Sequence, residues 1–214
     1  MNERTLNITG KGKVSVKPDL IILSFQINLI EKDYDTAVNK LNERVESLRN
    51  VIVRNGVPKD NIKTKIFSVD TETEWDKKKE SRIFVGFRAR HDLELEIPFD
   101  NALTNAIIRG IAKLNENIEF RISFGVKDTD KYQSQLIENA IENALAHAKT
   151  ITKATGVKLK EILNINFSFS EISFRSYDDT CSDSISLDCN ASMPDLNPSD
   201  IKADKTITIT WAIE

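Results

Sequence analysis

Gly10 and Gly12, near the start of the chain, are the first residues whose type and spacing could form a binding site. Glycine-rich turns at the start of a helix bind phosphates. A dinucleotide-binding fingerprint needs a strand, the pattern Gly-x-Gly-x-x-Gly and then a helix. Here Ser15 takes the place of the third glycine, and Val14 and Val16 continue a strand pattern. We therefore expect the two glycines to allow a bulge or a close crossing of strands rather than to hold a phosphate.

The two histidines are the next candidates for catalysis or metal binding. His91 alternates in phase with Leu93 and Leu95, which predicts a hydrogen-bonded imidazole in the interior. His147 lies one position off the apolar stripe of a predicted helix, which predicts a flanking or surface position. Neither has a second histidine four residues away or a cysteine nearby, so the sequence favours no transition-metal site.

An acidic stretch, 175–204, differs in composition from the rest of the chain. Its seven Asp residues face only Arg175 and Lys202, a local charge of −5 in a chain of net charge −3. Its apolar residues show no periodicity, which predicts a disordered or solvated loop. Calcium binding of the EF-hand type is not supported, because the central glycine and terminal glutamate are missing. Cys181 and Cys189 fall inside it and are interpreted as two free thiols, although a disulfide stays open.

Patterns of covalent or acid–base catalysis are also missing. The sequence has no Gly-x-Ser-x-Gly elbow and no cysteine with a plausible histidine partner. Glu94 and Glu96 share a predicted sheet face with Arg88 and Arg90, which favours ion pairs across strands over a carboxyl group with a raised pKa in a pocket. We therefore predict that the protein is not an enzyme and that it has no catalytic, cofactor-binding or metal-binding residues.

Composition narrows the class of protein further. The chain has 214 residues, 40% hydrophobic and 29% charged, which is typical of a globular protein of one or two domains. Its 30 basic residues do not exceed its 33 acidic ones, so nothing favours nucleic acid as a partner. No apolar run approaches the ~20 residues of a transmembrane helix. The start lacks the pattern of a secretion signal, so we expect a cytoplasmic protein, with the periplasm or cell envelope as the alternative if an export signal has been removed.

An internal repeat of about 100 residues organises the elements that must position these groups. Each copy contains a strand, a helical stripe that ends at a glycine, and a further strand; the landmarks are Leu23-Ser24-Phe25, Gly56 and Phe67-Ser68-Val69 in one, and Ile122-Ser123-Phe124, Gly156 and Phe167-Ser168-Phe169 in the other. Helices are predicted over 33–55 and 128–156 by their apolar periodicity, with a middle helix after Pro98.

Strict alternation of apolar and polar residues over 87–97, 118–126 and 206–213 predicts antiparallel sheets with one polar face. The predicted fold class is α+β, a two-layer sandwich of mainly antiparallel sheet with helices on one face and an internal β-α-β-β repeat. The repeat divides the chain into 1–97 and 98–214, and the second part contains the acidic loop.

A hairpin is predicted between Asp70 and Ser81, with Trp75 near its tip. An exposed tryptophan on such an arm is a possible contact to another chain. Packing of Trp75 in the core or within the hairpin stays open as the alternative.

Several segments together resemble the SIMPL-domain (YggE-like) proteins. The matching segments are Gly-Lys-Gly-Lys-Val-Ser-Val-Lys-Pro-Asp at 10–19, Gly-Phe-Arg-Ala at 86–89, Phe-Gly-Val-Lys-Asp at 124–128, Ala-Leu-Ala-His-Ala-Lys at 144–149 and Gly-Val-Lys-Leu at 156–159. The resemblance runs from about Ile8 to Phe169. Phe87 stands where the family has tyrosine, and Lys160 stands where it has a second glycine.

The resemblance implies a mixed α/β fold and a bacterial protein that is often found in the periplasm or envelope. It also implies assembly into large rings in some members and a loose link to tolerance of oxidative stress. It supplies no catalytic residues.

Three hypotheses about function follow. The first is a non-enzymatic homo-oligomeric scaffold in which hairpin 70–81, with Trp75, and exposed strand edges join the copies. The second is a small-molecule-binding protein or unrecognised enzyme with a site near the acidic loop. The third is an adaptor in signalling.

Overall fold

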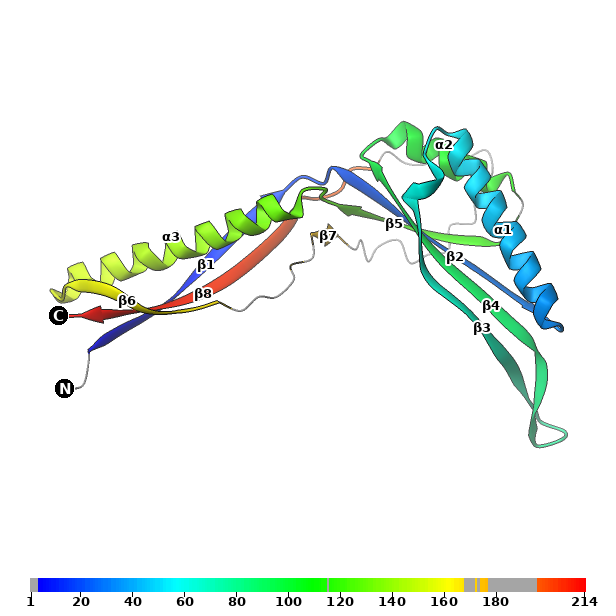
Figure 1. Cartoon of the computed structure of the whole chain (residues 1–214), viewed down its shortest axis with the longest axis horizontal. Helices are drawn as coiled ribbons and strands as arrows, with labels where there is room; N and C mark the ends of the chain where they lie inside the picture. Colours follow the sequence, from blue (N-terminus) through cyan, green and yellow to red (C-terminus); the bar gives the residue numbers. More distant parts are fainter. Residues whose placement is uncertain (1–3, 115, 168–171, 173, 177–195) are drawn as a thin grey trace. The chain divides into compact units, whose positions relative to one another are not determined.

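The computed structural model describes residues 4–114, 116–167, 172, 174–176 and 196–214. These residues form three α-helices and two mainly antiparallel sheets, and the helices are interspersed with the strands along the chain (Figure 1). The elements are β1 (Thr5–Val16), β2 (Leu20–Glu31), α1 (Tyr34–Arg54), the short 3-10 helix η1 (Lys59–Asn61), β3 (Ile62–Asp76), β4 (Ser81–Pro98), α2 (Asn101–Ala112), β5 (Ile118–Gly125), α3 (Thr129–Thr155), β6 (Leu159–Asn166), β7 (Arg175–Ser176) and β8 (Ile201–Ile213). The predicted α+β fold class is confirmed.

The chain forms two compact units, which we describe separately. Counting described residues only, the first unit takes them from Met1–Pro18, Val126–Arg175 and Ser199–Glu214, and the second takes the rest. The repeat predicted a division between residues 97 and 98. The structure groups the chain differently, because β1 and β8, at opposite ends of the sequence, pair along their whole length.

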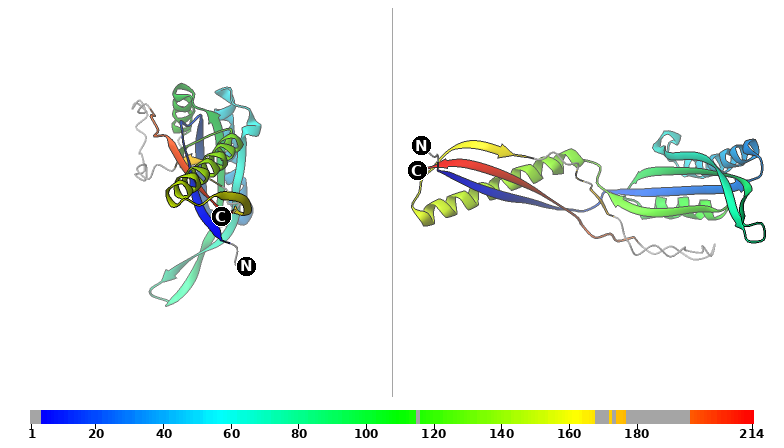
Figure 2. Two further views of the ribbon diagram at one scale, coloured as in Figure 1. Left: turned by 90° about the vertical axis from the view of Figure 1, so that its left-hand side faces the viewer. Right: turned by 90° about the horizontal axis from the view of Figure 1, so that it is seen from below.

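The first unit is a three-stranded antiparallel sheet in the order β1-β8-β6, with α3 on one face (Figure 2). Its buried residues come from the inward face of β1 and β8 and from one stripe of α3, and they include Ile8, Ile209, Trp211 and three alanines, Ala140, Ala144 and Ala148. Alternate residues of β1 and β8 are inward, as expected for strands with one covered face.

The second unit is a five-stranded sheet in the order β3-β4-β2-β5-β7, covered on one face by α1 and α2. Its core consists of large aliphatic and aromatic side chains. The largest fully buried ones include Phe25 on β2, Leu93 on β4, and Leu41, Leu48 and Ile52 on α1.

Helix boundaries follow the local signals of the sequence. Asp33 accepts a hydrogen bond from the backbone N–H of Thr36 at the start of α1 (2.9 Å), and Asp128 does the same for Lys131 at the start of α3 (3.2 Å). Gly56 and Gly156 follow the two helices with φ of 84° and 75°, the left-handed conformation that glycine adopts without a steric penalty. These landmarks of the repeat are confirmed.

The strands before the two helices do not match in the way the repeat predicted. Leu23 on β2 and Ile122 on β5 were expected to be equivalent landmarks of the two copies, and they stand opposite each other in one sheet. The strand of the first unit that corresponds to β2 is β1, since β1 is the neighbour of β8 as β2 is the neighbour of β4. The N-terminal strand β1 therefore supplies the first strand of the second copy of the repeat.

Within the described residues, none of the helices is both long and apolar enough to cross a bilayer.

Candidate interaction site

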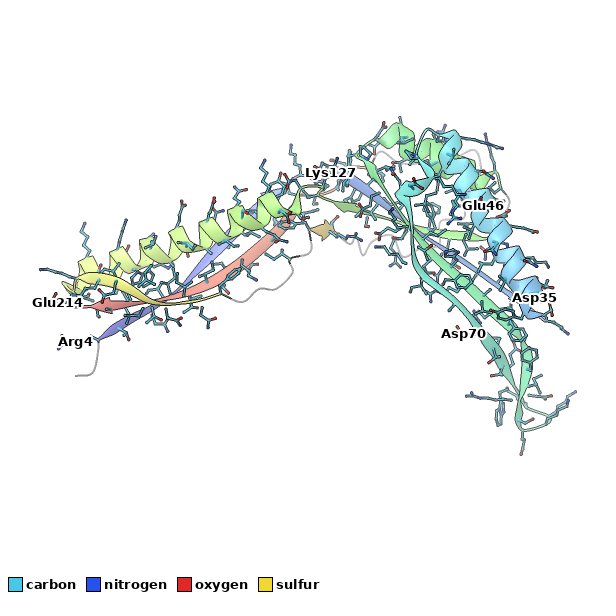
Figure 3. The ribbon with its side chains drawn as sticks, viewed as in Figure 1. Arg4, Asp35, Glu46, Asp70, Lys127 and Glu214 are labelled. Carbon is cyan, nitrogen blue, oxygen red and sulfur yellow. The ribbon has the colours of Figure 1, made fainter. Side chains whose placement is uncertain are left out.

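The hairpin of β3 and β4 extends beyond the N-terminal end of α1 in Figure 1, and we call residues 71–87 the arm. Its turn is closed by Asp76, whose side chain accepts hydrogen bonds from the backbone N–H groups of Lys78 (2.8 Å) and Lys79 (3.3 Å). Glu80 completes the turn with a φ of 46°. The predicted hairpin tip is confirmed, and the side chains beyond Asp70 project from it in Figure 3.

A β-bulge in the arm decides which side chains share a face. The register shifts between Glu72, which stands opposite Gly86, and Thr73, which stands opposite Phe84. The extra residue brings Phe84 to the same face as Phe87, although they are three positions apart. A Cβ atom on Gly86 would lie 2.4 Å from the carbonyl oxygen of Glu31, so the bulge also needs glycine there.

Four aromatic side chains line this face, and we call Tyr34, Phe87, Phe84 and Trp75 the aromatic stripe. The rings of Phe84 and Phe87 are 5.3 Å apart and those of Tyr34 and Phe87 are 5.7 Å apart, both edge to face. Thr73 stands opposite Phe84, and Trp75 is two residues after Thr73 on the same strand. Trp75 therefore lies on the same face of the hairpin as Phe84.

The aromatic stripe is largely open to solvent. Tyr34 is 48% exposed, Phe84 54% and Trp75 61%. The predicted exposure of Trp75 is confirmed, and its role as a contact to another copy stays a prediction. Sequence reasoning missed Tyr34 and Phe84, because the bulge that unites them with Trp75 leaves no periodic signal. Apolar side chains grouped in this way on a surface are typical of interaction sites.

The sheet face opposite α1 is charged, and its groups form ion pairs. Arg88 on β4 donates from Nε to Glu72 on β3 (2.7 Å), a hydrogen bond that lowers the pKa of Glu72 and raises that of Arg88. Lys65 contacts Glu94 (2.8 Å), whose residue is only 9% exposed. The predicted cross-strand pairing is present, and Glu94 is more buried than a solvated row would make it. The pair of Arg88 with Glu72 links the two strands at the base of the arm.

His91 lies on β4 under α1 and is 8% exposed, as predicted for an interior histidine. Its Nε2 is 2.9 Å from the hydroxyl of Thr64, and its ring contacts Phe67 edge to face. Burial lowers the pKa of His91, and the nearby positive charge of Arg49 lowers it further. The arrangement favours the neutral form of the imidazole.

Gly10 and Gly12 lie within β1, against helix α3. A Cβ atom on Gly10 would stand 2.1 Å from the carbonyl oxygen of Ala140, and one on Gly12 would stand 2.0 Å from that of Leu136. The expectation of a close crossing is right in kind, but the partner is a helix rather than a strand. The glycines let the strand backbone approach the helix backbone.

A shallow groove lies between β1 and α3 on the first unit. Its volume is about 400 Å³, and it is lined by Asn7, Ile8, Thr9, His147, Thr150 and Ile151. His147 is exposed there, as predicted. Ile151, at the helix side of this groove, is 37% exposed.

Most of the acidic stretch, with Cys181 and Cys189, lies outside the described residues. Two of its aspartates are described: Asp200 accepts a hydrogen bond from the hydroxyl of Ser15 (3.1 Å), and Asp204 pairs with Lys11 (2.9 Å). Among the residues that the structure describes, no three His, Cys, Asp or Glu side chains are grouped to hold a metal ion.

Comparison with known proteins gives one family and several relatives. The model of the SIMPL family, described as a protein of unknown function (DUF541), matches residues 6–211. The chain is similar to the uncharacterized protein YggE of Edwardsiella ictaluri (26% identity over 159 residues) and to that of Escherichia coli K12 (25% over 159 residues). These 159 residues are 74% of this chain but 66% and 63% of the two relatives, so the match spans less than two thirds of their length.

Proposed function

We propose, from the premise that this chain belongs to the SIMPL family, that it is a non-enzymatic scaffold protein that assembles with copies of itself. The observation that supports the proposal is the aromatic stripe of the arm. Its outermost residue, Trp75, is 61% exposed, whereas tryptophan is on average a largely buried residue. Burial of aromatic side chains supplies much of the free energy of protein–protein contacts.

The arm is suited to this role because it is both extended and anchored. Its base is held by the ion pair of Arg88 with Glu72 and by the contact of Phe87 with Tyr34 at the start of α1. An aromatic surface whose position is fixed before binding loses less conformational entropy on association than one on a free loop.

Light scattering on a gel-filtration column tests the proposal directly. We expect a mass above that of one chain at about 10–50 μM, because specific protein–protein interfaces commonly have micromolar or tighter affinity. The double variant Trp75→Ser/Phe84→Ser should shift the equilibrium toward monomer by at least tenfold in Kd. Lys79→Ser, in the turn of the same arm, is the matched control and should leave the mass unchanged.

A strictly monomeric wild-type chain at those concentrations would contradict the scaffold proposal. An unchanged oligomer in the double variant would remove the arm from the interface. The link to oxidative stress, the compartment, the signalling-adaptor role and a ligand site near the acidic loop stay predictions.

A further inference from the structure

Within the residues that the structure describes, the three-stranded sheet of the first unit has two edge strands, β1 and β6, and their edges differ. The outer edge of β1 is partly covered by α3. The backbone N–H of Lys11 donates to the side-chain oxygen of Asn143 (2.9 Å), and the side-chain amide of Asn139 donates to the carbonyl of Lys13 (3.0 Å). Helix side chains thus satisfy backbone groups that another strand would need.

The edge of β6 presents apolar side chains instead. Ile162 is 49% exposed, Leu163 41% and Ile165 51%. From Ile162 to Asn166 the strand carries no charged residue. An exposed apolar edge strand without charges is the kind of edge that pairs with another strand.

The register of the sheet shows which backbone groups of β6 are turned outward. Lys158 and Glu214 exchange two backbone hydrogen bonds (2.7 and 3.0 Å), so the even-numbered residues of β8 direct their backbone groups toward β6. Thr208 and Thr210 are even-numbered and stand opposite Asn166 and Asn164. Because antiparallel strands alternate, the N–H and C=O groups of Ile165, between these two, point away from β8.

We infer that β6 pairs antiparallel with β6 of a second copy of this chain, which joins two three-stranded sheets into one. The inference rests on the proposed self-assembly and names a surface of it other than the arm. An isologous pairing uses the same strand of both copies. The exposed apolar side chains of β6 in each copy, Ile162, Leu163 and Ile165, therefore cover those of the other. Main-chain hydrogen bonds at Ile165 add to this burial.

The charges explain why a second copy fits β6 and not the edges of β1 or β3. Two identical strands that pair bring identical charges together, and like charges that stand opposite each other destabilise a sheet. The C-terminal part of β6, residues 162–166, has none, although Lys160 and Glu161 precede it. The edge of β1 carries Lys11 and Lys13, and that of β3 carries Lys63 and Lys65. Self-pairing of those edges would set lysine against lysine.

A pairing centred on Asn164 places the two copies of this residue opposite each other as a non-hydrogen-bonded pair. The Cα atoms of such a pair are about 4.5 Å apart, which is within the range of a disulfide bond. The probe is Asn164→Cys in a chain that also carries Cys181→Ser and Cys189→Ser, oxidised and run on a non-reducing gel. Asn7→Cys, on β1 in the same background, is the matched control.

We expect most of the Asn164→Cys chain to become a covalent dimer and the Asn7→Cys chain to stay uncrosslinked. A second variant, Ile165→Lys, adds a like charge at the pairing and should weaken self-association at least tenfold. Ile151→Lys, on the exposed surface of α3, should not. Circular dichroism of both lysine variants checks that they fold.

The outcomes separate this inference from the scaffold proposal. An oligomer that persists without a cross-link at residue 164 and with Ile165→Lys unchanged overturns the β6 pairing alone. If the cross-link at residue 164 forms but the mass of the chain without the cross-link does not change with Trp75→Ser, then β6 is part of the interface and the arm is not. A strictly monomeric chain overturns both.

Discussion

In the first unit α3 lies against β1 across two glycines, whereas in the second unit α1 lies against β2 and β4 across leucine, isoleucine and phenylalanine side chains. The helix stripe differs correspondingly, with Ala140, Ala144 and Ala148 on α3. Both units contain a helix that ends at a left-handed glycine and leads into antiparallel strands, β3 and β4 after α1, and β6 and β8 after α3. The helix therefore packs on its sheet through close backbone contact in the first unit and through large side chains in the second.

The difference teaches that the two units fail in opposite ways. A core filled by large side chains loses stability when atoms are removed, because a cavity remains. A contact made by backbone proximity loses stability when atoms are added, because nothing can move aside. The variants below test this contrast.

The largest effect is expected for Leu48→Ala on α1. Leu48 is fully buried, and leucine-to-alanine changes at such sites reduce the free energy of unfolding by about 2 to 5 kcal/mol. Urea unfolding followed by circular dichroism measures the loss. Val53→Ala, at a 47% exposed position of the same helix, is the control and should stay within about 0.5 kcal/mol of the wild type. Equal losses at both positions would refute the distinction between the buried and exposed faces of α1.

A smaller loss is expected for Gly12→Ala in the first unit. The added Cβ atom would meet the backbone of α3 at 2.0 Å from the carbonyl oxygen of Leu136, and overpacking of this kind costs about 1 to 3 kcal/mol. Fluorescence of the buried Trp211, in a chain with Trp75→Phe, reports unfolding of this unit.

Gly156→Ala is the matched control for that variant. Nothing lies within 4 Å of the position where its Cβ atom would be, but its φ is 75°, so only the backbone conformation is penalised, by about 1 kcal/mol. If Gly12→Ala costs less than Gly156→Ala, close approach to the helix does not explain the glycines of β1.

The smallest effect concerns the pH dependence that His91 gives the second unit. Because its pKa in the folded chain is below the ordinary value of 6.5, the folded state binds fewer protons than the unfolded state. Its neutral form stabilises the fold fully above pH 6.5, and this contribution decreases as the pH falls through 6.5 toward the folded pKa. Asp92 opposes the shift that burial and Arg49 cause.

Urea unfolding at about pH 8 and about pH 5 should therefore show a loss at low pH that is reduced in His91→Gln. His147→Gln, at an exposed position, serves as the control and should keep the wild-type loss. An identical pH dependence in His91→Gln would show that other groups account for it.

Local features of the fold could be predicted from the sequence because each has a local physical cause. The sequence offers Asp33 or Asp35 as the cap of one helix and Asp128 or Asp130 as that of the other, and the structure shows Asp33 and Asp128. Gly56 and Gly156 are predicted as helix ends from residues within one turn of each helix. Alternation over 87–97 predicted His91 in the interior. The turn residues after Trp75 predicted a hairpin tip, but they left open whether the side chain is exposed or packed.

Features that depend on distant residues could not be predicted. Strand alternation cannot say that Gly12 meets a helix, because the partner, Leu136, is more than a hundred positions away. The segment that contains Ile162 and Ile165 is as apolar as a core strand, and only the sheet order shows that it lies on an edge. The aromatic stripe depends on a bulge, and a bulge shifts the phase on which pattern reading relies.

The place of β8 between β1 and β6 has a consequence for the order of events during synthesis. The strands β2 to β5 of the second unit come from the continuous stretch Asp19–Gly125, so they can pair while the ribosome is still translating the rest. β1 and β6 cannot pair until the last strand, Ile201–Ile213, emerges. A polypeptide truncated before Ile201 would thus keep one sheet and leave two strands unpartnered, the state in which chaperones and proteases engage a nascent chain.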